Sequence, residues 1–218
     1  RWVRYYLRFT LQRPLWIHFK SITFRRCLNG IFMHNLLFIF VLCTHCFFSQ
    51  KDRSELNHKY IYDLPFESDK TVLIMQGYFG KFSHVDKYAL DFRLRKGKLV
   101  CAARGGSVLK VVEHHNIGGA NIKYINNGNY VVIDHRDGTY GGYWHLQKNG
   151  ALVEIGDNIQ VGQPIGKSGS TGFSSMAHLH FMVYSYDENG RQYTLPTLFK
   201  TKKKGARYLK SYSWVKHH

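Results

Sequence analysis

Residues 156–166 read Gly-Asp-Asn-Ile-Gln-Val-Gly-Gln-Pro-Ile-Gly. Two short apolar runs, at 159–161 and 164–168, are separated and flanked by glycines, which favour turns. Each run has the length of a strand and is too short for a typical helix. The stretch therefore predicts a β-hairpin, and it sets the expectation for the sequence on both sides of it.

The same pattern of short apolar runs and turn residues continues through the chain after residue 50. Glycine, asparagine and aspartate mark the expected loops, and long helical periodicity is absent. The sequence therefore predicts an all-β domain. The expected strands cover residues 72–75, 99–103, 107–112, 130–134, 142–146, 159–161, 164–168 and 178–184.

The hairpin at 156–166 resembles that of biotinyl and lipoyl carrier domains and of the related barrel-sandwich hybrids. A carrier function is excluded, because no lysine flanked by methionine or other hydrophobic residues follows at a hairpin tip where a cofactor would be attached. The resemblance therefore implies a barrel-sandwich hybrid fold without carrier chemistry.

A His-x-His pair, His178 and His180, opens the last expected strand. The two-residue period of a strand places both imidazoles on one face. Such a pair is by itself more often a surface or hydrogen-bonded pair than a metal site. Further candidates are His84, Asp91 and His145, since imidazole and carboxylate are ligands that zinc accepts.

Three segments together resemble the lysostaphin and LytM zinc endopeptidases: residues 84–92, 143–146 and 156–181. The resemblance covers roughly residues 72–185, with the hairpin, the turns and the histidines in the family's order. It implies a duplicated hybrid motif, a variant of the barrel-sandwich hybrid, and hydrolysis of peptidoglycan peptides.

The resemblance also implies a role for each candidate residue. His84, Asp91 and His180 would be the zinc ligands, which leaves a fourth position for water. His145 and His178 would be the catalytic pair. Which of these two histidines acts as the base is left open by the sequence.

The spacing between the first histidine and the aspartate departs from the common family pattern. Six residues separate His84 from Asp91, where three are usual. An offset of seven would place the two side chains on opposite faces of a regular strand, so the chain between them must bulge or turn. Asp86 is a rival ligand.

Residues 169–172, Gly-Ser-Thr-Gly, are expected to form a tight turn that shapes the cleft.

The net charge of +17 favours a polyanionic partner, which could be nucleic acid, an anionic membrane surface or an acidic wall. Residues 1–49 contribute seven basic residues and no acidic ones, which leaves 24 Lys and Arg against 14 Asp and Glu. The remaining basic residues are dispersed, and no nucleic-acid recognition motif is present, so nucleic acid is excluded as a partner.

The sequence divides into segments of different composition. Residues 1–32 are a candidate for upstream sequence, 33–49 for a signal peptide, 50–71 for a pre-domain segment, and 186–218 for a solvated basic extension. An uncleaved 33–49 segment would instead be a membrane anchor. In either case the domain at 72–185 is expected outside the cytoplasm, periplasmic or secreted. After cleavage Cys101 would be the one remaining cysteine.

The sequence predicts an active, monomeric wall hydrolase, and two alternatives stay open. One is a catalytically inactive LytM-like regulator of other wall enzymes, and the other is a secreted toxin-like peptidase. The remaining histidines receive ordinary roles: His114, His115 and His135 are expected at the surface, and His217 and His218 look incidental.

Overall fold

The computed structural model describes residues 60–202 and 205–218. The predicted upstream sequence, the signal peptide and most of the pre-domain segment lie outside the described residues. Within the described residues, no helix is long and apolar enough to cross a membrane. The helical content there is one short 3-10 helix, η1 (Ile122–Asn127), so the prediction of an all-β domain is confirmed.

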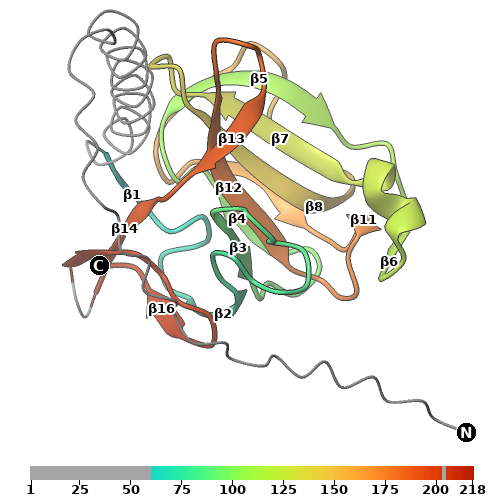
Figure 1. Ribbon diagram of the computed structural model, residues 1–218, viewed down its shortest axis with the longest axis horizontal. Coiled ribbons are helices and arrows are strands. Elements are labelled where there is room, and N and C mark those ends of the chain that lie inside the picture. Colours follow the sequence, from blue (N-terminus) through green and yellow to red (C-terminus); the bar gives the residue numbers. More distant parts are fainter. Residues whose placement is uncertain (1–59, 203–204) are drawn as a thin grey trace, which may run out of the picture. The chain divides into compact units, whose positions relative to one another are not determined.

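Most strands belong to one large sheet, whose strands differ in length (Figure 1). Its hydrogen-bonded order is β16-β2-β3-β12-β8-β7-β5-β9, while β4, β10 and β13 pair with it off this path. These strands are β2 (Thr71–Gln76), β3 (Ala89–Phe92), β4 (Leu99–Cys101), β5 (Gly106–Val112), β7 (Asn129–Asp134), β8 (Tyr140–Ala151), β9 (Asn158–Ile159), β10 (Pro164–Ser168), β12 (Leu179–Tyr186), β13 (Gln192–Leu195) and β16 (Trp214–Lys216).

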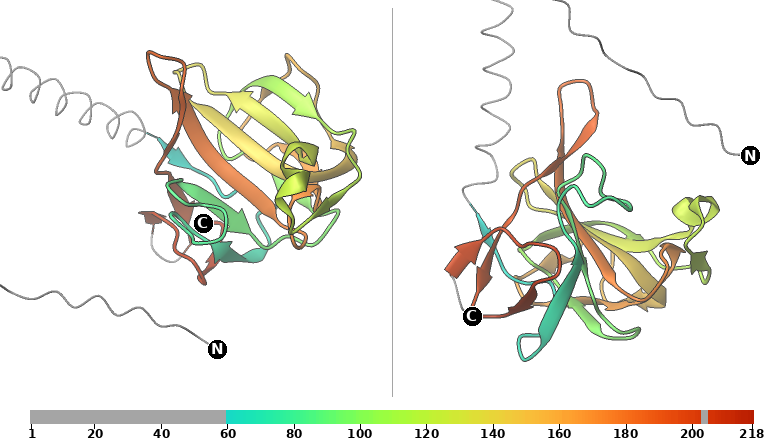
Figure 2. Two further views of the ribbon diagram at one scale, coloured as in Figure 1. Left: turned by 45° about the vertical axis from the view of Figure 1, so that its right-hand side comes forward. Right: turned by 60° about the horizontal axis from the view of Figure 1, so that its bottom comes forward.

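Two small sheets complete the fold. One contains β1 (Ile61–Tyr62), β14 (Leu198–Thr201) and β15 (Gly205–Arg207), and the other pairs β6 (Gly118–Gly119) with β11 (Gly172–Phe173). Helix η1 contacts β6 and β11, and the right-hand view of Figure 2 shows it at one end of the large sheet.

Each expected strand corresponds to an observed strand, with bounds that differ by a few residues. The 156–166 stretch turns at two glycines with left-handed backbone, Gly156 and Gly162, whose φ angles are 96° and 79°. Its two strands do not pair with each other as a simple hairpin would. Strand β9 pairs with β5, and β10 pairs with β4 and β8. The stretch therefore joins separate parts of the large sheet.

The core extends beyond the expected limits of 72 and 185 on both sides. Tyr62 in β1 is fully buried and its ring lies 6.3 Å from that of Phe199 in β14. Phe199 also packs on Phe92 and Phe181, from β3 and β12. Part of the pre-domain segment and part of the basic extension are therefore integral to the folded unit.

The prediction of a solvated extension over 186–218 needs correction. Its lysines at 200, 202, 210 and 216 are exposed, but Leu209 and Val215 between them are buried. Strand β16 pairs with β2, and β14 pairs with β1. The prediction rested on the many basic residues of this segment. The apolar residues between them are buried, and their burial holds the segment on the core.

Candidate active site

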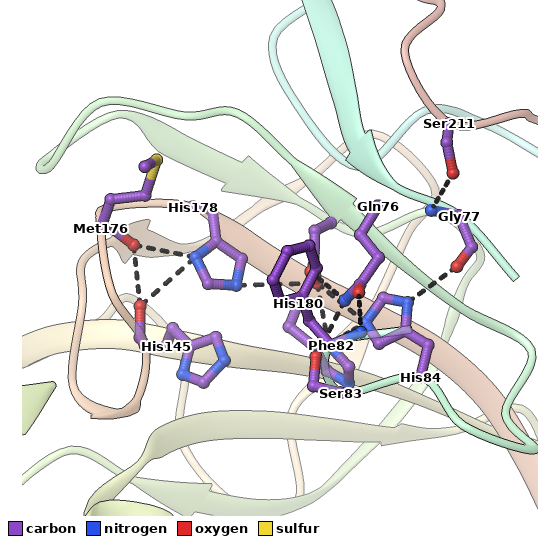
Figure 3. A network of polar contacts seen from close by, with 12 residues as sticks. Gln76, Gly77, Phe82, Ser83, His84, His145, Met176, His178, His180 and Ser211 are labelled. Atoms are coloured by element: carbon purple, nitrogen blue, oxygen red, sulfur yellow. Dashed lines mark hydrogen bonds and ion pairs between the residues drawn. The ribbon is translucent and has the colours of Figure 1, made fainter. Parts of the chain in front are cut away.

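Neighbouring strands of the large sheet bring the candidate residues together (Figure 3). His180 in β12 lies directly opposite Asp91 in β3, and on its other side it pairs with Trp144 in β8. His145 follows Trp144, and His178 immediately precedes β12. Residues far apart in the sequence therefore meet at one place on the sheet.

The loop between β2 and β3 brings His84 to the same place. The chain turns at 77–80 and again at 84–87, where the His84 carbonyl accepts a hydrogen bond from the Lys87 amide at 3.0 Å. Asp86 in this turn has a left-handed φ of 58° and is exposed. The expected turn between His84 and Asp91 is confirmed, and Asp86 lies outside the site.

Three potential ligand atoms converge at the centre of the site. Asp91 Oδ1 lies 3.1 Å from His84 Nε2 and 2.9 Å from His180 Nδ1, and the two histidine nitrogens are 3.1 Å apart. His84 and Asp91 are buried, and His180 is nearly so. The sequence proposed these same three residues as the metal ligands.

The protonation of His84 fits a cation at this point. His84 Nδ1 lies 2.9 Å from the Gly77 carbonyl, which can only accept, so Nδ1 carries the proton. Nε2 of the neutral ring then has a lone pair aimed at a carboxylate oxygen and at another imidazole nitrogen. Two imidazoles and a carboxylate are a common zinc donor set, and an outer hydrogen bond from the ligand histidine to a carbonyl is typical of such sites.

Asp91 is held as a carboxylate. Burial alone would raise its pKa, but the adjacent imidazoles of His180, His84 and His178 outweigh burial and hold the pKa well below the usual range. Its second oxygen, Oδ2, accepts a hydrogen bond from Gln76 Nε2 at 3.0 Å. Gln76 thus leaves Oδ1 directed at the two histidines.

His145 and His178 lie next to each other, with ring centroids 4.6 Å apart. His145 Nδ1 donates to the Thr171 carbonyl at 2.7 Å, and His178 Nδ1 donates to the Met176 carbonyl at 2.8 Å. In the neutral rings Nε2 is therefore a free base. His178 Nε2 lies 3.6 Å from Asp91 Oδ1, so the pair borders the proposed metal ligands.

The environment of His145 keeps its ring neutral. Burial, reinforced by the neighbouring His178 and His180, lowers the pKa of His145 to about 3. Its backbone has a left-handed φ of 67°, which is unusual for a residue other than glycine. Residues held in such a conformation are often found at functional sites.

A cleft of about 430 Å³ opens beside these residues. Apolar side chains, among them the exposed Phe82 and Met176, form much of its wall. A second hollow of about 300 Å³ shares Ser83, His145 and Phe173 with it and includes His180. The histidines therefore lie between two recesses that an extended chain could occupy.

Sequence reasoning missed the residues that orient the site. Gln76 donates a hydrogen bond to Asp91. The main-chain carbonyls of Gly77, Thr171 and Met176 accept hydrogen bonds from His84, His145 and His178, in that order. A carbonyl carries no side-chain signal, so only the expected turn at 169–172 hinted at one of them. The expectation that His135 lies at the surface was wrong, because its side chain is buried beneath Tyr62.

Comparison with known proteins gives a consistent result. Residues 85–193, half of the chain, match the model of peptidase family M23. The glycyl-glycine endopeptidase ALE-1 of Staphylococcus capitis is 34% identical over 113 residues, which are 51% of this chain and 28% of that protein. The peptidoglycan DD-endopeptidase ShyC of Vibrio cholerae is 42% identical over 72 residues, 32% of this chain and 16% of that protein.

Among solved structures, the catalytic domain of lysostaphin from Staphylococcus simulans aligns with 57% of this chain and 87% of that domain, at 28% identity and a TM-score of 0.40. The chain spans less than a third of the length of the curated relatives named above. The family match nevertheless covers Asp91, His145, His178 and His180. The chain belongs to peptidase family M23.

Proposed function

We propose that the protein is a zinc-dependent endopeptidase that hydrolyses peptide bonds in the cross-links or stem peptides of peptidoglycan. One observation carries the proposal: His84, Asp91 and His180 converge on a point that His145 and His178 border. Three ligands with an open position are typical of catalytic zinc, whereas structural zinc sites have four protein ligands.

Zinc held there would polarise a peptide carbonyl and make water a nucleophile near neutral pH. The protein's own histidines then handle the protons. Nε2 of one ring of the His145 and His178 pair takes a proton from the attacking water. The other ring, protonated at Nε2 for this step, would donate a hydrogen bond to the carbonyl oxygen as charge develops on it and later give that proton to the leaving amine. The proton taken from the water then replaces it. The carbonyl contacts at both Nδ1 atoms keep these rings oriented.

A catalytically inactive regulator is the alternative from a different class. Such a protein does not need an intact set of ligands and bases. Here all five positions carry competent residues, and each side chain is oriented by a hydrogen bond. This arrangement favours the enzyme.

The substrate class follows from the family and from charge. ALE-1 and ShyC are named for cleavage of glycyl-glycine bonds and of peptidoglycan, and such bonds in a wall are the natural candidates for this chain. A strongly basic protein is attracted to an anionic wall. We infer that it acts as a monomer outside the cytoplasm, where that substrate lies.

The test is metal content together with digestion of purified sacculi, for the wild type and three variants. His180→Ala should lose both zinc and activity. His145→Ala should retain near-stoichiometric zinc and lose at least a hundredfold in rate, as is typical for removal of a general acid or base. His114→Ala, at an exposed residue outside the cleft, is the matched control and should behave as wild type. A wild-type protein without zinc and without activity would support the regulator instead.

A further inference from the structure

The segment after the family match reaches the metal ligands. The match ends at residue 193, yet Ser211 Oγ accepts a hydrogen bond from the Gly77 amide at 2.8 Å. The carbonyl of Gly77 in turn accepts the Nδ1 proton of His84 (Figure 3). We propose that Ser211 is a positioning residue of the metal site, a role that rests on the proposed function.

The Ser211 contact lies where it can affect the orientation of two proposed ligands, His84 and Asp91. The amide that it holds belongs to the peptide bond between Gln76 and Gly77. Gln76 donates to Asp91, and Gly77 accepts from His84, so these adjacent residues orient one ligand each. A shift of the backbone at this peptide would move the Gly77 carbonyl, which lies in the next peptide group, and the Cα from which the Gln76 side chain reaches Asp91. Ser211 therefore restrains the outer hydrogen bonds of His84 and Asp91 together.

Ser211 is itself held firmly. The Tyr212 amide donates to the Ile74 carbonyl at 2.7 Å, and the Ile74 amide donates to the Ser213 carbonyl at 2.9 Å. Strand β16 then continues this pairing along β2. Buried Leu209 and Val215 fix the segment on either side. The serine hydroxyl is therefore part of a fixed turn rather than of a mobile tail.

The absence of a side chain at residue 77 fits this close approach. A Cβ atom at Gly77 would lie 2.9 Å from Ser211 Oγ and 3.0 Å from the Ser211 amide nitrogen. Real Cβ atoms essentially never come as close as 2.9 Å, and 3.0 Å is tighter than nine in ten real Cβ contacts. Glycine lets the two backbones come close enough for the hydrogen bond.

The experiment compares zinc affinity, measured by competition with a chelator on the full chain, among isosteric variants. Ser211→Thr retains the hydroxyl, whereas Ser211→Val has the same shape and lacks it. Removal of an outer-shell partner typically weakens metal binding about 10- to 100-fold. We expect a loss of at least about tenfold for Ser211→Val relative to Ser211→Thr. Ser213→Ala is the control, since its hydroxyl donates to the Lys210 carbonyl within the same turn.

A second readout does not depend on the metal. Nitrogen NMR of the His84 ring in the metal-free protein should show a protonated Nδ1 in Ser211→Thr and a mixture of tautomers in Ser211→Val. Equal zinc affinity and equal ring spectra in the two variants would overturn the role of Ser211 alone. If the wild-type protein binds no zinc, the proposed function fails with it.

Discussion

At the scale of single residues, two histidines, the partly buried His145 and the buried His135, are kept neutral in different surroundings. His145 borders the cleft, next to two other imidazoles. His135 lies elsewhere, under Tyr62, where burial lowers its pKa to about 4. Its Nδ1 donates to the Gly105 carbonyl at 3.0 Å, and Nε2 has no partner among the described residues. A proton on Nε2 would therefore be buried and unsatisfied.

This environment predicts a pH dependence of stability. The pKa of His135 rises from about 4 in the folded protein to about 6.5 on unfolding, so the unfolded state binds more protons as the pH falls below 6.5. Stability is therefore lost between pH 6.5 and 4. His135 should cost about 2 kcal/mol of unfolding free energy between pH 7 and pH 5.

His135→Gln tests this prediction, because the amide can still donate to Gly105 but does not titrate. Urea denaturation of both proteins at pH 7 and pH 5 isolates the histidine, since all other titrating groups are common to them. Parallel losses in the two proteins would show that His135 does not titrate on unfolding.

At the scale of elements, two β-bulges direct side chains into the site. The pairing of β7 with β8 jumps from Tyr130–Trp144 to Asn129–Leu146, which leaves His145 as the extra residue. The pairing of β2 with β3 shifts in the same way next to Gln76, which then faces Asp91. Bulges are frequent next to active sites, because they redirect a side chain.

The bulges also mark where sequence reasoning stops. Alternation along β12 correctly placed His178 and His180 near one another, and short apolar runs located the main strands. In β8 the bulge at His145 interrupts such an alternation. A bulge depends on the partner strand's register, and a single strand's sequence does not contain that information. The same holds for Gln76.

The contact between β6 and β11 gives a test at this scale. A Cβ atom at Gly118 would lie 2.0 Å from the Ser170 carbonyl oxygen, next to Thr171, whose carbonyl holds His145. The structure shows no tight turn at 169–172, since Gly169 bridges to His178 and Gly172 begins β11. Gly118→Ala should therefore displace the segment 170–172 that connects them. We expect zinc to be retained and the rate on sacculi to fall at least tenfold, since small displacements of catalytic groups have large effects.

Gly138→Ala is the matched control for this substitution. Gly138 has a left-handed φ of 83° and open space around it, so alanine there costs about 1 kcal/mol of stability without a clash. It should leave activity intact. Full activity in Gly118→Ala would mean that the segment 170–172 does not hold His145 in its working position.

At the scale of the whole molecule, the folded unit is larger than the region that matches the family. Basic residues after 196 suggested a solvated segment, but charge reports only on the exposed side chains of β14 to β16. The segment contacts the core through the buried side chains of Phe199, Leu209 and Val215. A short strand that alternates lysine with an apolar residue has the same composition as a polar tail, and only its partners distinguish the two.

Adjacent residues in β14 separate the packing role of this segment from its charge. Phe199 is fully buried against Tyr62, Phe92 and Phe181, while Lys200 is exposed. Phe199→Ala should lower the free energy of unfolding by about 3–5 kcal/mol, because it leaves a cavity in the core. Lys200→Ala should change it by less than about 0.5 kcal/mol. Denaturant unfolding of both variants measures the difference. Similarly small effects of the two substitutions would mean that the segment is an appended tail and not part of the core.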